Sequence, residues 1–229
     1  TPVSATSGVV NIGVNTPQWS AAAVMNANPA SYFASTRKII AGRSEGNVNG
    51  SAAGVDFDWS SVSGDNGTLK DELDKPIPAS VGDGLAQDRL NYLRGVKTKE
   101  GTPFRSRSSL LGDIVNSPVV YSKPFAENVN TPAYKTFMAN NSSRPGALFV
   151  GANDGMFHAF NAATGAEIFA YIPSWLASKL PALTDPTYNS SKHQSYVDGQ
   201  TDIAEALVGG NWKTVLLPST VGGGHGVFA

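Results

Sequence analysis

Three short apolar segments separated by two turn sequences constrain the fold of this chain most strongly. The segments are Ala147–Gly151, Met156–Phe160 and Glu167–Ile172, and the turns between them are Asn153-Asp154-Gly155 and Asn161–Gly165. Asp-Gly is a strong hairpin signal, because both residues tolerate the positive φ that tight turns need. Segments of this length match strands better than helices. The sequence therefore predicts three consecutive antiparallel strands.

A fourth strand is expected before these three. Gly112–Tyr121 has strand character but contains Pro118, which lacks an N–H group for the sheet and favours an edge or a bulge. Residues 122–145 follow as an insertion, and residues 173–195 form a second insertion after the last strand. We therefore predict that Gly112–Ile172 folds as a four-stranded antiparallel meander.

The pattern recurs towards the end of the printed sequence. Tyr196–Ala204 parallels Gly112–Tyr121, Trp212–Pro218 parallels Ala147–Gly151, and Val227–Ala229 parallels the start of the next strand. Four-stranded units repeated along a chain are typical of a β-propeller. The predicted fold class is all-β: a partial β-propeller with four-stranded antiparallel quinoprotein-like blades, long insertions and one or two short helices.

The first half of the chain carries weaker signals. The apolar run Lys38–Gly42 predicts a buried strand, and the alternation in Val55–Trp59 predicts a strand with one wet face. Residues 85–95 predict a helix that stops at Gly95, and Ala133–Ala139 predicts a second short helix.

We interpret these elements as parts of one domain. Residues 1–229 are expected to be a fragment of a single β-propeller domain. Within it, residues 1–108 form an irregular first-blade region with the helix near 85–95, and residues 109–229 form two successive blades, the second cut short. The 24 glycines and 14 prolines agree with a fold that has many turns.

Composition and charge exclude several classes of function. The net charge of −1 leaves no basic stripe, so no nucleic-acid partner is expected. No segment approaches the roughly 20 apolar residues of a membrane span, so no transmembrane segment is expected. The chain has no cysteine, which excludes disulfides, thiolate metal sites and cysteine catalysis.

The acidic residues of the first half do not form a calcium-loop pattern. Asp56, Asp58, Asp65 and Asn66 lack the alternating spacing of an EF-hand-like loop, and Gly67 is not followed by a closing Glu. We interpret them as a wet strand face and a turn, and predict no metal ligands, catalytic residues or cofactor-binding residues in this chain.

The histidines and a basic pair are further candidates for site residues. His158, His193 and His225 lie on separate segments without metal-ligand spacing, and His158 is expected to be a packed or hydrogen-bonded structural residue. Arg105 and Arg107 could bind an anion, but structural ion pairs are the favoured interpretation.

The four tryptophans offer either blade packing or sugar-binding platforms. Trp19, Trp59, Trp175 and Trp212 could each do either, and Trp59 and Trp212 fit packing. Trp175 lies in the insertion after the meander, and loops often carry binding residues. Trp175 is therefore the interaction candidate.

Four segments in order carry a family resemblance. They are Gln87–Gly95, Phe104–Pro118, Val150–Phe160, and Trp212–Leu217 followed by Gly226–Ala229. Together they resemble the start of the C-terminal propeller of the PilY1/PilC family of type IV pilus tip proteins. Quinoprotein-type blades share the Val150–Phe160 pattern, so the ordered set is more specific than that segment alone.

The resemblance implies a type IV pilus biogenesis factor and tip adhesin without enzymatic activity. Family members are extracellular, at the pilus tip or the outer-membrane surface of Gram-negative bacteria. Their partners are minor pilins and a host or abiotic surface, and they support pilus extension and retraction, twitching motility and attachment. The family's calcium loop is expected after Ala229, so calcium is a possible cofactor of the full-length protein only.

Two other functions remain open at this point. A quinoprotein dehydrogenase using pyrroloquinoline quinone would share the blade pattern, although this chain lacks adjacent cysteines and a clear Glu/Asn/Asp set for calcium and cofactor. A scaffold for outer-membrane assembly uses similar blades, but residues 85–118 match the pilus family pattern better. The adhesin is the predicted function.

Overall fold

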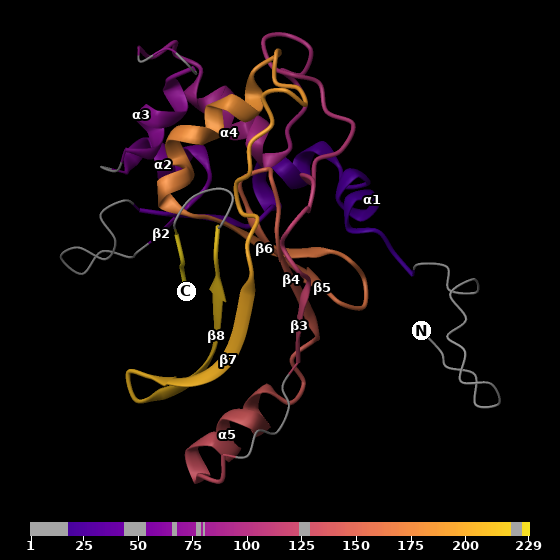
Figure 1. Cartoon of the computed structure of the whole chain (residues 1–229), viewed down its shortest axis with the longest axis vertical. Helices are drawn as coiled ribbons and strands as arrows, with labels where there is room; N and C mark the ends of the chain where they lie inside the picture. The colour runs from indigo at the N-terminus through magenta and orange to yellow at the C-terminus, as the bar shows by residue number, and fades with distance from the viewer. Residues whose placement is uncertain are drawn as a thin grey trace.

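The computed structural model describes residues 18–43, 54–65, 68–76, 79, 81–123, 129–220 and 226–229 (Figure 1). The helical elements in these ranges are α1 (Ala21–Asn26), the π-helix η2 (Tyr32–Thr36), α2 (Trp59–Gly64), α3 (Leu69–Asp74), α4 (Ala86–Arg94), α5 (Pro132–Asn141) and the 3₁₀ segment η3 (Ser174–Thr184). The strands are β1 (Ile39–Gly42), β2 (Gly54–Asp56), β3 (Val120–Ser122), β4 (Ala147–Gly151), β5 (Phe157–Asn161), β6 (Glu167–Ile172), β7 (Thr201–Val208) and β8 (Asn211–Pro218).

The larger sheet has the strand order β2-β1-β6-β5-β4-β3. Strands β3 to β6 form consecutive antiparallel pairs, which confirms the predicted four-stranded meander. Strand β1 adds to the free edge of β6 in parallel, with Ile40 opposite Tyr171, and β2 pairs antiparallel with β1. The sheet is therefore mixed, because the first half of the chain supplies two of its strands.

Tight turns join the strands of the meander as the sequence predicts. Asn161 accepts hydrogen bonds from the backbone N–H groups of Ala163 and Thr164, and Gly165 has φ +72°. A side chain at Gly165 would also meet the ring of Trp19, whose Nε1 donates to the Ala162 carbonyl. The β5–β6 turn is thus both a local structure and a docking point for the N-terminal segment.

The first predicted strand of the meander is much shorter than expected. Only Val120–Ser122 of the region around Gly112–Tyr121 pairs in the sheet, so the prediction of a longer strand was wrong. The preceding residues bond to side chains and loops instead: the Ser117 hydroxyl accepts from the N–H of Gly151, and the Asp113 carbonyl accepts from the N–H of Asn153. A loop replaces the ladder here.

The first half of the chain is more helical than predicted. The described residues hold five α-helices rather than one or two, and four of them precede residue 95, where an irregular region was expected. The predicted strand Val55–Trp59 ends at Asp56, since the Asp58 carboxylate accepts from the N–H of Ser61 and caps α2.

The two helices that the sequence did predict are confirmed. Helix α4 ends at Gly95, which has φ +109° and the left-handed conformation of a C-terminal cap. Helix α5 spans Pro132–Asn141 around the predicted Ala133–Ala139, and Thr131 caps its N-terminus. Local capping signals therefore fixed both elements.

A separate hairpin follows the larger sheet. Strands β7 and β8 pair antiparallel along their full length, and Gly209 and Gly210 form the turn with φ +58° and +78°. The strand predicted at Trp212–Pro218 is confirmed, whereas the one predicted at Tyr196–Ala204 begins only at Thr201. The hairpin lies beside the sheet, with β7 next to β3 (Figure 1).

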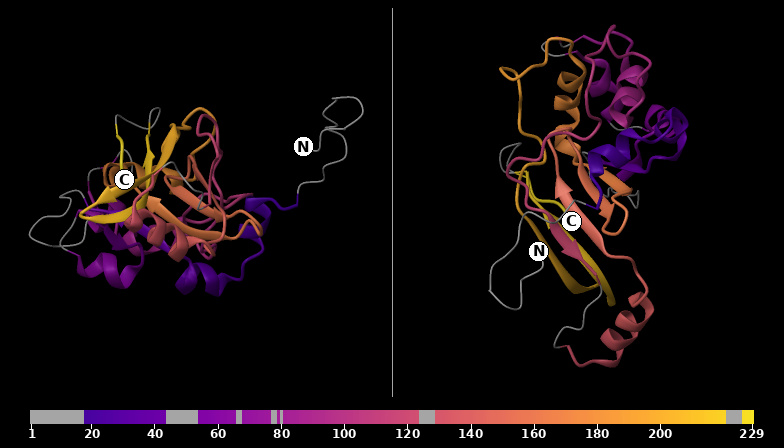
Figure 2. Two further views of the ribbon diagram at one scale, coloured as in Figure 1. Left: turned by 90° about the horizontal axis from the view of Figure 1, so that it is seen from below. Right: turned by 90° about the vertical axis from the view of Figure 1, so that its right-hand side faces the viewer.

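The main core joins both halves of the chain. Buried side chains from the helical first half, such as Phe57 and Leu90, share one cluster with Phe157 and Leu176 of the later segments. Strand β5 lies inside the sheet and four of its five residues are buried. The side view in Figure 2 shows the helices of the first half on one side of the meander and the hairpin on the other.

The two insertions leave the meander at opposite ends. Because β3, β4, β5 and β6 alternate in direction, the insertion after β3 and the insertion after β6 must lie at opposite ends of the sheet. Figure 1 shows α5 at the lower end, and η3 packs beside α3 and α4 at the upper end. The two insertions therefore do not share one end of the meander.

Candidate functional site

A buried network of charges ties the meander to the first half of the chain. His158 on β5 is fully buried, and its Nδ1 lies 2.8 Å from Glu167 Oε1 on β6. Its Nε2 lies 3.1 Å from Oδ1 of Asp154 in the β4–β5 turn. Arg37 donates to both carboxylate oxygens of Glu167 and to the carbonyl of Arg94 at the end of α4. The predicted structural role of His158 is confirmed.

The network changes the proton affinity of its members. Burial alone would lower the pKa of His158, but the carboxylates of Asp154 and Glu167 raise it to about 9. Burial alone would raise the pKa of Glu167, but the hydrogen bonds and charge of Arg37, with those of His158, lower it to about 2. All four side chains are therefore charged near neutral pH, and each charge faces an opposite one.

Paired polar side chains connect the meander to the segment that leads into β7. Asp198 accepts hydrogen bonds from the N–H and the side-chain amide of Asn116. The Asn153 amide donates to Asp113, and Asn153 Oδ1 accepts from the N–H of Tyr196. Asp198 directly, and Asp113 through Asn153, thus both contribute to the contact between the meander region and this segment.

Trp175 occupies an intermediate position between surface and core. It is the second residue of η3 and is 40% exposed. Its ring packs edge-on against Phe228 and covers Gly226, where an added Cβ would overlap the indole. One part of the ring therefore holds the C-terminal segment, and the rest is open to a partner.

The other tryptophans pack within the protein. Trp59 packs against the main core, and Trp212 contacts the ring of Tyr134 on α5 edge-on, with centroids 4.7 Å apart. Tyr134 also donates from its hydroxyl to Glu205 of β7, so α5 is fastened to the hairpin. The packing interpretation is confirmed for Trp59 and Trp212.

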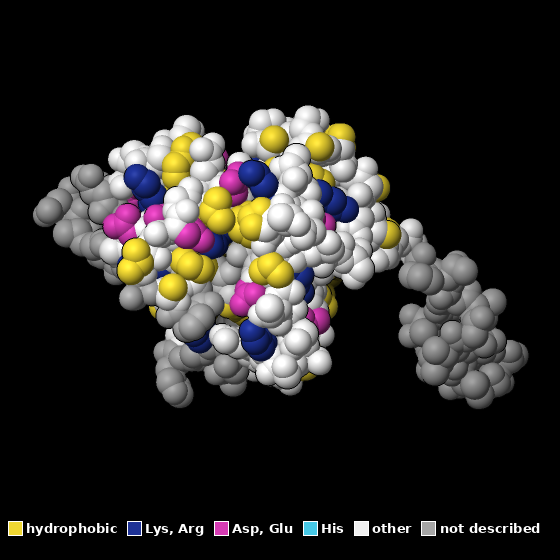
Figure 3. All heavy atoms as spheres, turned by 90° about the horizontal axis from the view of Figure 1, so that it is seen from above, with side chains coloured by type: hydrophobic (Ala, Val, Ile, Leu, Met, Phe, Trp, Pro, Cys, Tyr) yellow, Lys and Arg dark blue, Asp and Glu magenta, His cyan; other side chains and the backbone are white. Residues whose placement is uncertain are grey.

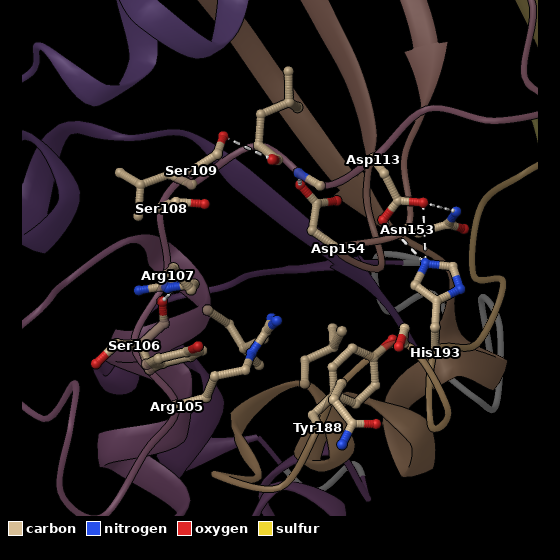
Figure 4. A pocket seen from close by; sticks show the side chains of 18 residues that line it. Arg105, Ser106, Arg107, Ser108, Ser109, Asp113, Asn153, Asp154, Tyr188 and His193 are labelled. Carbon is tan, nitrogen blue, oxygen red and sulfur yellow. Dashed lines mark hydrogen bonds and ion pairs between the residues drawn. The ribbon is translucent and has the colours of Figure 1, made fainter.

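The structure separates the two arginines of the basic pair. Arg107 forms the predicted ion pair, since its guanidinium bonds Glu100, donates to the Tyr92 carbonyl and stacks on the Tyr92 ring. Arg105 stacks on Tyr188 instead, with its guanidinium carbon 4.8 Å from the ring centroid. No carboxylate among the residues that the structure describes lies within ion-pair distance of Arg105. Figure 4 shows both side chains at one pocket.

The acidic residues of the first half serve local structure. Asp58 caps α2, and Asp65 pairs with Arg43 at 2.6 Å. Asn66 and Gly67 lie outside the described residues. Within the described ranges, no three His, Asp or Glu side chains are grouped so that they could hold a metal ion.

Of the remaining histidines, His193 lies in the described residues. Its Nε2 lies 3.0 Å from Asp113 Oδ2 at the pocket, whereas His158 contacts Asp154 and Glu167. His225 lies outside the described residues. Sequence reasoning missed the Arg37–Glu167 pair, because the partners are separated by 130 residues and neither carries a motif.

The face of the protein shown in Figure 3 carries charged side chains of both signs. Seen from above, Lys and Arg side chains are interspersed with Asp and Glu. No helix in the described ranges is long and apolar enough to cross a membrane.

The chain has the elements of a β-propeller protein, because propeller blades are four-stranded antiparallel meanders like β3 to β6. Residues 111–229 match the family model described as the PilY1 beta-propeller domain, so the chain belongs to this family. No solved structure matches the chain.

Curated relatives extend the similarity into the first half of the chain. The chain is 39% identical over 225 residues to the type IV pilus biogenesis factor PilY1 of Pseudomonas aeruginosa strain PAK, covering 94% of this chain. It is 39% identical over 175 residues to a PilY1 homolog of Xylella fastidiosa strain Temecula1, covering 71% of this chain. The chain spans only 18% of the Pseudomonas relative and 14% of the Xylella relative.

Proposed function

We propose that this chain is part of a type IV pilus biogenesis factor and tip adhesin. The observation that carries the proposal is the match of residues 111–229 to the PilY1 propeller, together with 39% identity to PilY1 over 94% of the chain. The proposal places the protein outside the cell, at the pilus tip or the outer-membrane surface, with minor pilins and a host or abiotic surface as partners.

The proposed role is mechanical and adhesive rather than enzymatic. The buried charges around His158 are paired with one another, which suits rigidity better than proton transfer to a substrate. A rigid meander that carries insertions at both ends can contact a pilin at one end and another surface at the other. Calcium, expected on the family resemblance, stays a prediction for the longer protein.

Genetic complementation tests the proposal directly. Deletion of the gene should abolish twitching motility and reduce surface attachment, and the wild-type gene should restore both. Retained twitching and attachment in the deletion strain would contradict the proposal. A quinoprotein dehydrogenase finds no support in the comparisons; alcohol oxidation by the purified protein with pyrroloquinoline quinone and calcium would contradict the non-enzymatic part.

Trp175 is the proposed contact residue, and its test separates attachment from assembly. Trp175→Ala should reduce attachment several-fold while pili are still assembled, because an exposed aromatic face contributes strongly to binding. Trp175→Phe keeps a ring against Phe228 and controls for folding. Tyr121→Ala removes an aromatic ring that is 55% exposed elsewhere and should leave attachment unchanged. Equal loss in both alanine variants would contradict a specific role.

A further inference from the structure

A pocket of about 360 Å³ lies between the loop before β3 and the insertion after β6. Residues 105–110 form one wall, Asn153 and Asp154 of the β4–β5 turn form the base, and Asp113, Tyr188 and His193 form the opposite wall (Figure 4). Its volume lies in the range of small-molecule sites. The wall is polar, so a ligand here would be recognised mainly through hydrogen bonds and charge.

Arg105 supplies the pocket with a positive charge that the described protein does not neutralise. Its guanidinium stacks on Tyr188 and points into the pocket in Figure 4. The neighbouring Arg107, by contrast, is neutralised by Glu100 at 2.7 Å. An arginine fixed by stacking and without a carboxylate partner is well suited to receive a carboxylate from a ligand.

The Tyr92 hydroxyl is buried beside Arg105 and close enough to interact with its side chain. Neither this hydroxyl nor the buried Arg105 Nε makes a hydrogen bond of ordinary geometry with a described residue. The tyrosine hydroxyl can accept from the guanidinium, which has five N–H donors and therefore keeps others for a ligand. A ligand oxygen that enters beside the Arg105 guanidinium would accept from these other donors.

The opposite wall offers acceptors rather than further positive charge. The Asp113 carboxylate is 52% exposed and is held in place by the Asn153 amide and by His193. A carboxylate so placed accepts hydrogen bonds from ligand hydroxyls, and it disfavours ligands with more than one negative charge. Ser106 and Ser108 add hydroxyl groups to the wall that carries Arg105.

We propose that this pocket binds an acidic monosaccharide unit, a hexuronate whose carboxylate meets Arg105 and whose hydroxyls meet Asp113. The ligand combines one negative charge with several hydroxyl donors, which is the complement of the two walls. The proposal does not depend on the pilus assignment, since it stands on the pocket alone, and it names a different place from Trp175.

Titration calorimetry of the purified full chain tests the ligand class. Glucuronate and galacturonate are the probes; glucose lacks the carboxylate, acetate lacks the hydroxyls, and inorganic phosphate carries a higher charge. We expect at least one uronate to bind about tenfold or more tightly than each of the other three, as one charge-assisted contact is worth about that factor. Binding of acetate or phosphate as tight as that of the better uronate would overturn the proposal, as would no binding of either uronate.

Three variants assign the binding to this pocket. Arg105→Gln should weaken uronate binding about tenfold or more, and Asp113→Asn should weaken it less while leaving the preference over glucose intact. Lys135→Gln removes one charge from an exposed position on α5 and should change nothing. Thermal unfolding checks that each variant is folded. If a folded Arg105→Gln variant bound the uronate with unchanged affinity, the binding would lie elsewhere and the proposal would be wrong.

Discussion

Around His158, the charged side chains of Arg37 and Glu167 are almost fully buried, and Asp154 is partly exposed at the pocket. Arg37 is 3% exposed and His158 is fully buried, so each charge relies on its protein neighbours for stabilisation. Removing one partner would leave the others buried and unpaired, which costs far more than the pair contributes when intact. The network therefore makes the position of Arg37, and with it the start of β1, depend on the geometry of β5 and β6.

The raised pKa of His158 predicts a pH-dependent stability. Its pKa is about 9 in the folded protein against an ordinary value of 6.5 in an unfolded chain, so the stabilisation is complete below pH 6.5 and is lost as the pH rises towards 9. The loss is about 3 kcal/mol. Urea denaturation at several pH values should show this decline in the wild type and a flatter profile in His158→Gln.

The lowered pKa of Glu167 predicts a second loss of stability, at acidic pH, in the same experiment. Because its pKa is about 2 rather than 4.5, its stabilisation is present above pH 4.5 and is lost as the pH falls towards 2. Stability from this network should therefore be greatest between pH 4.5 and 6.5. Parallel profiles for wild type and His158→Gln between pH 6.5 and 9 would contradict the ion network.

Gly165 provides a residue-scale test of the β5–β6 turn. An alanine there would adopt φ +72° and place its Cβ 2.4 Å from the Trp19 ring. Gly209 also has positive φ, but a Cβ there meets nothing within 4 Å. Gly209→Ala should cost about 1–2 kcal/mol of unfolding free energy from the backbone alone. Gly165→Ala should cost clearly more, and equal losses in thermal or urea denaturation would contradict the Trp19 contact.

At the scale of elements, helix α4 is held by one of its own last residues. The Arg94 guanidinium is buried and donates to the carbonyls of Phe33, Arg37 and Phe57 at 3.0, 2.9 and 2.7 Å. It thus joins α4 to three separate points of the preceding chain. Arginine is common at helix C-termini, where its charge interacts favourably with the helix dipole. Here the same side chain also links α4 to other elements through hydrogen bonds.

Arg94→Met should cost at least about 3 kcal/mol of unfolding free energy, since three buried carbonyls lose charged donors. Urea denaturation measures the change. Lys97→Met removes a positive charge from an exposed position nearby and should have an effect within about 0.5 kcal/mol. A small effect for Arg94→Met would mean that these carbonyls find other partners.

Elements defined by local signals were predictable from the sequence, and elements defined by distant partners were not. The turns at Asn161–Gly165 and the cap at Gly95 carry their own chemistry, and strands β4 and β6 match their predicted bounds. The parallel pairing of Ile39–Gly42 with β6 joins segments about 130 residues apart, and no local pattern encodes it. The strand expected at Gly112–Tyr121 failed because side chains such as Ser117 take the hydrogen bonds that a ladder would need.

The same distinction holds for the candidate site residues: those with local signals were predictable, and those defined by distant partners were not. The exposure of Trp175 agrees with its expected place in an insertion, and the structural ion pair predicted for the basic pair holds for Arg107. The lack of a carboxylate beside Arg105 in the described protein could not be foreseen, because it depends on where Glu100 and Tyr188 lie in space.

At the scale of the whole molecule, the first half of the chain is part of the propeller sheet and its core. The matched propeller region begins at residue 111, yet β1 and β2 extend its sheet and Phe57 and Leu90 lie in its main core. Removing residues 1–110 would uncover the edge of β6 and the apolar partners of these side chains. Exposed edges and large apolar patches both favour aggregation.

A chain of residues 111–229 alone should therefore be insoluble or loosely packed, even though it contains the whole family match. Coexpression with residues 1–110 should restore solubility, because the two pieces then rebuild one core across the β1–β6 pairing. Size-exclusion chromatography and the dispersion of amide NMR signals measure the outcome. A monomeric species with dispersed signals from residues 111–229 alone would contradict this prediction. It would mean that the sheet folds without the first half of the chain, and that the Arg37–Glu167 pair joins two independently folding units.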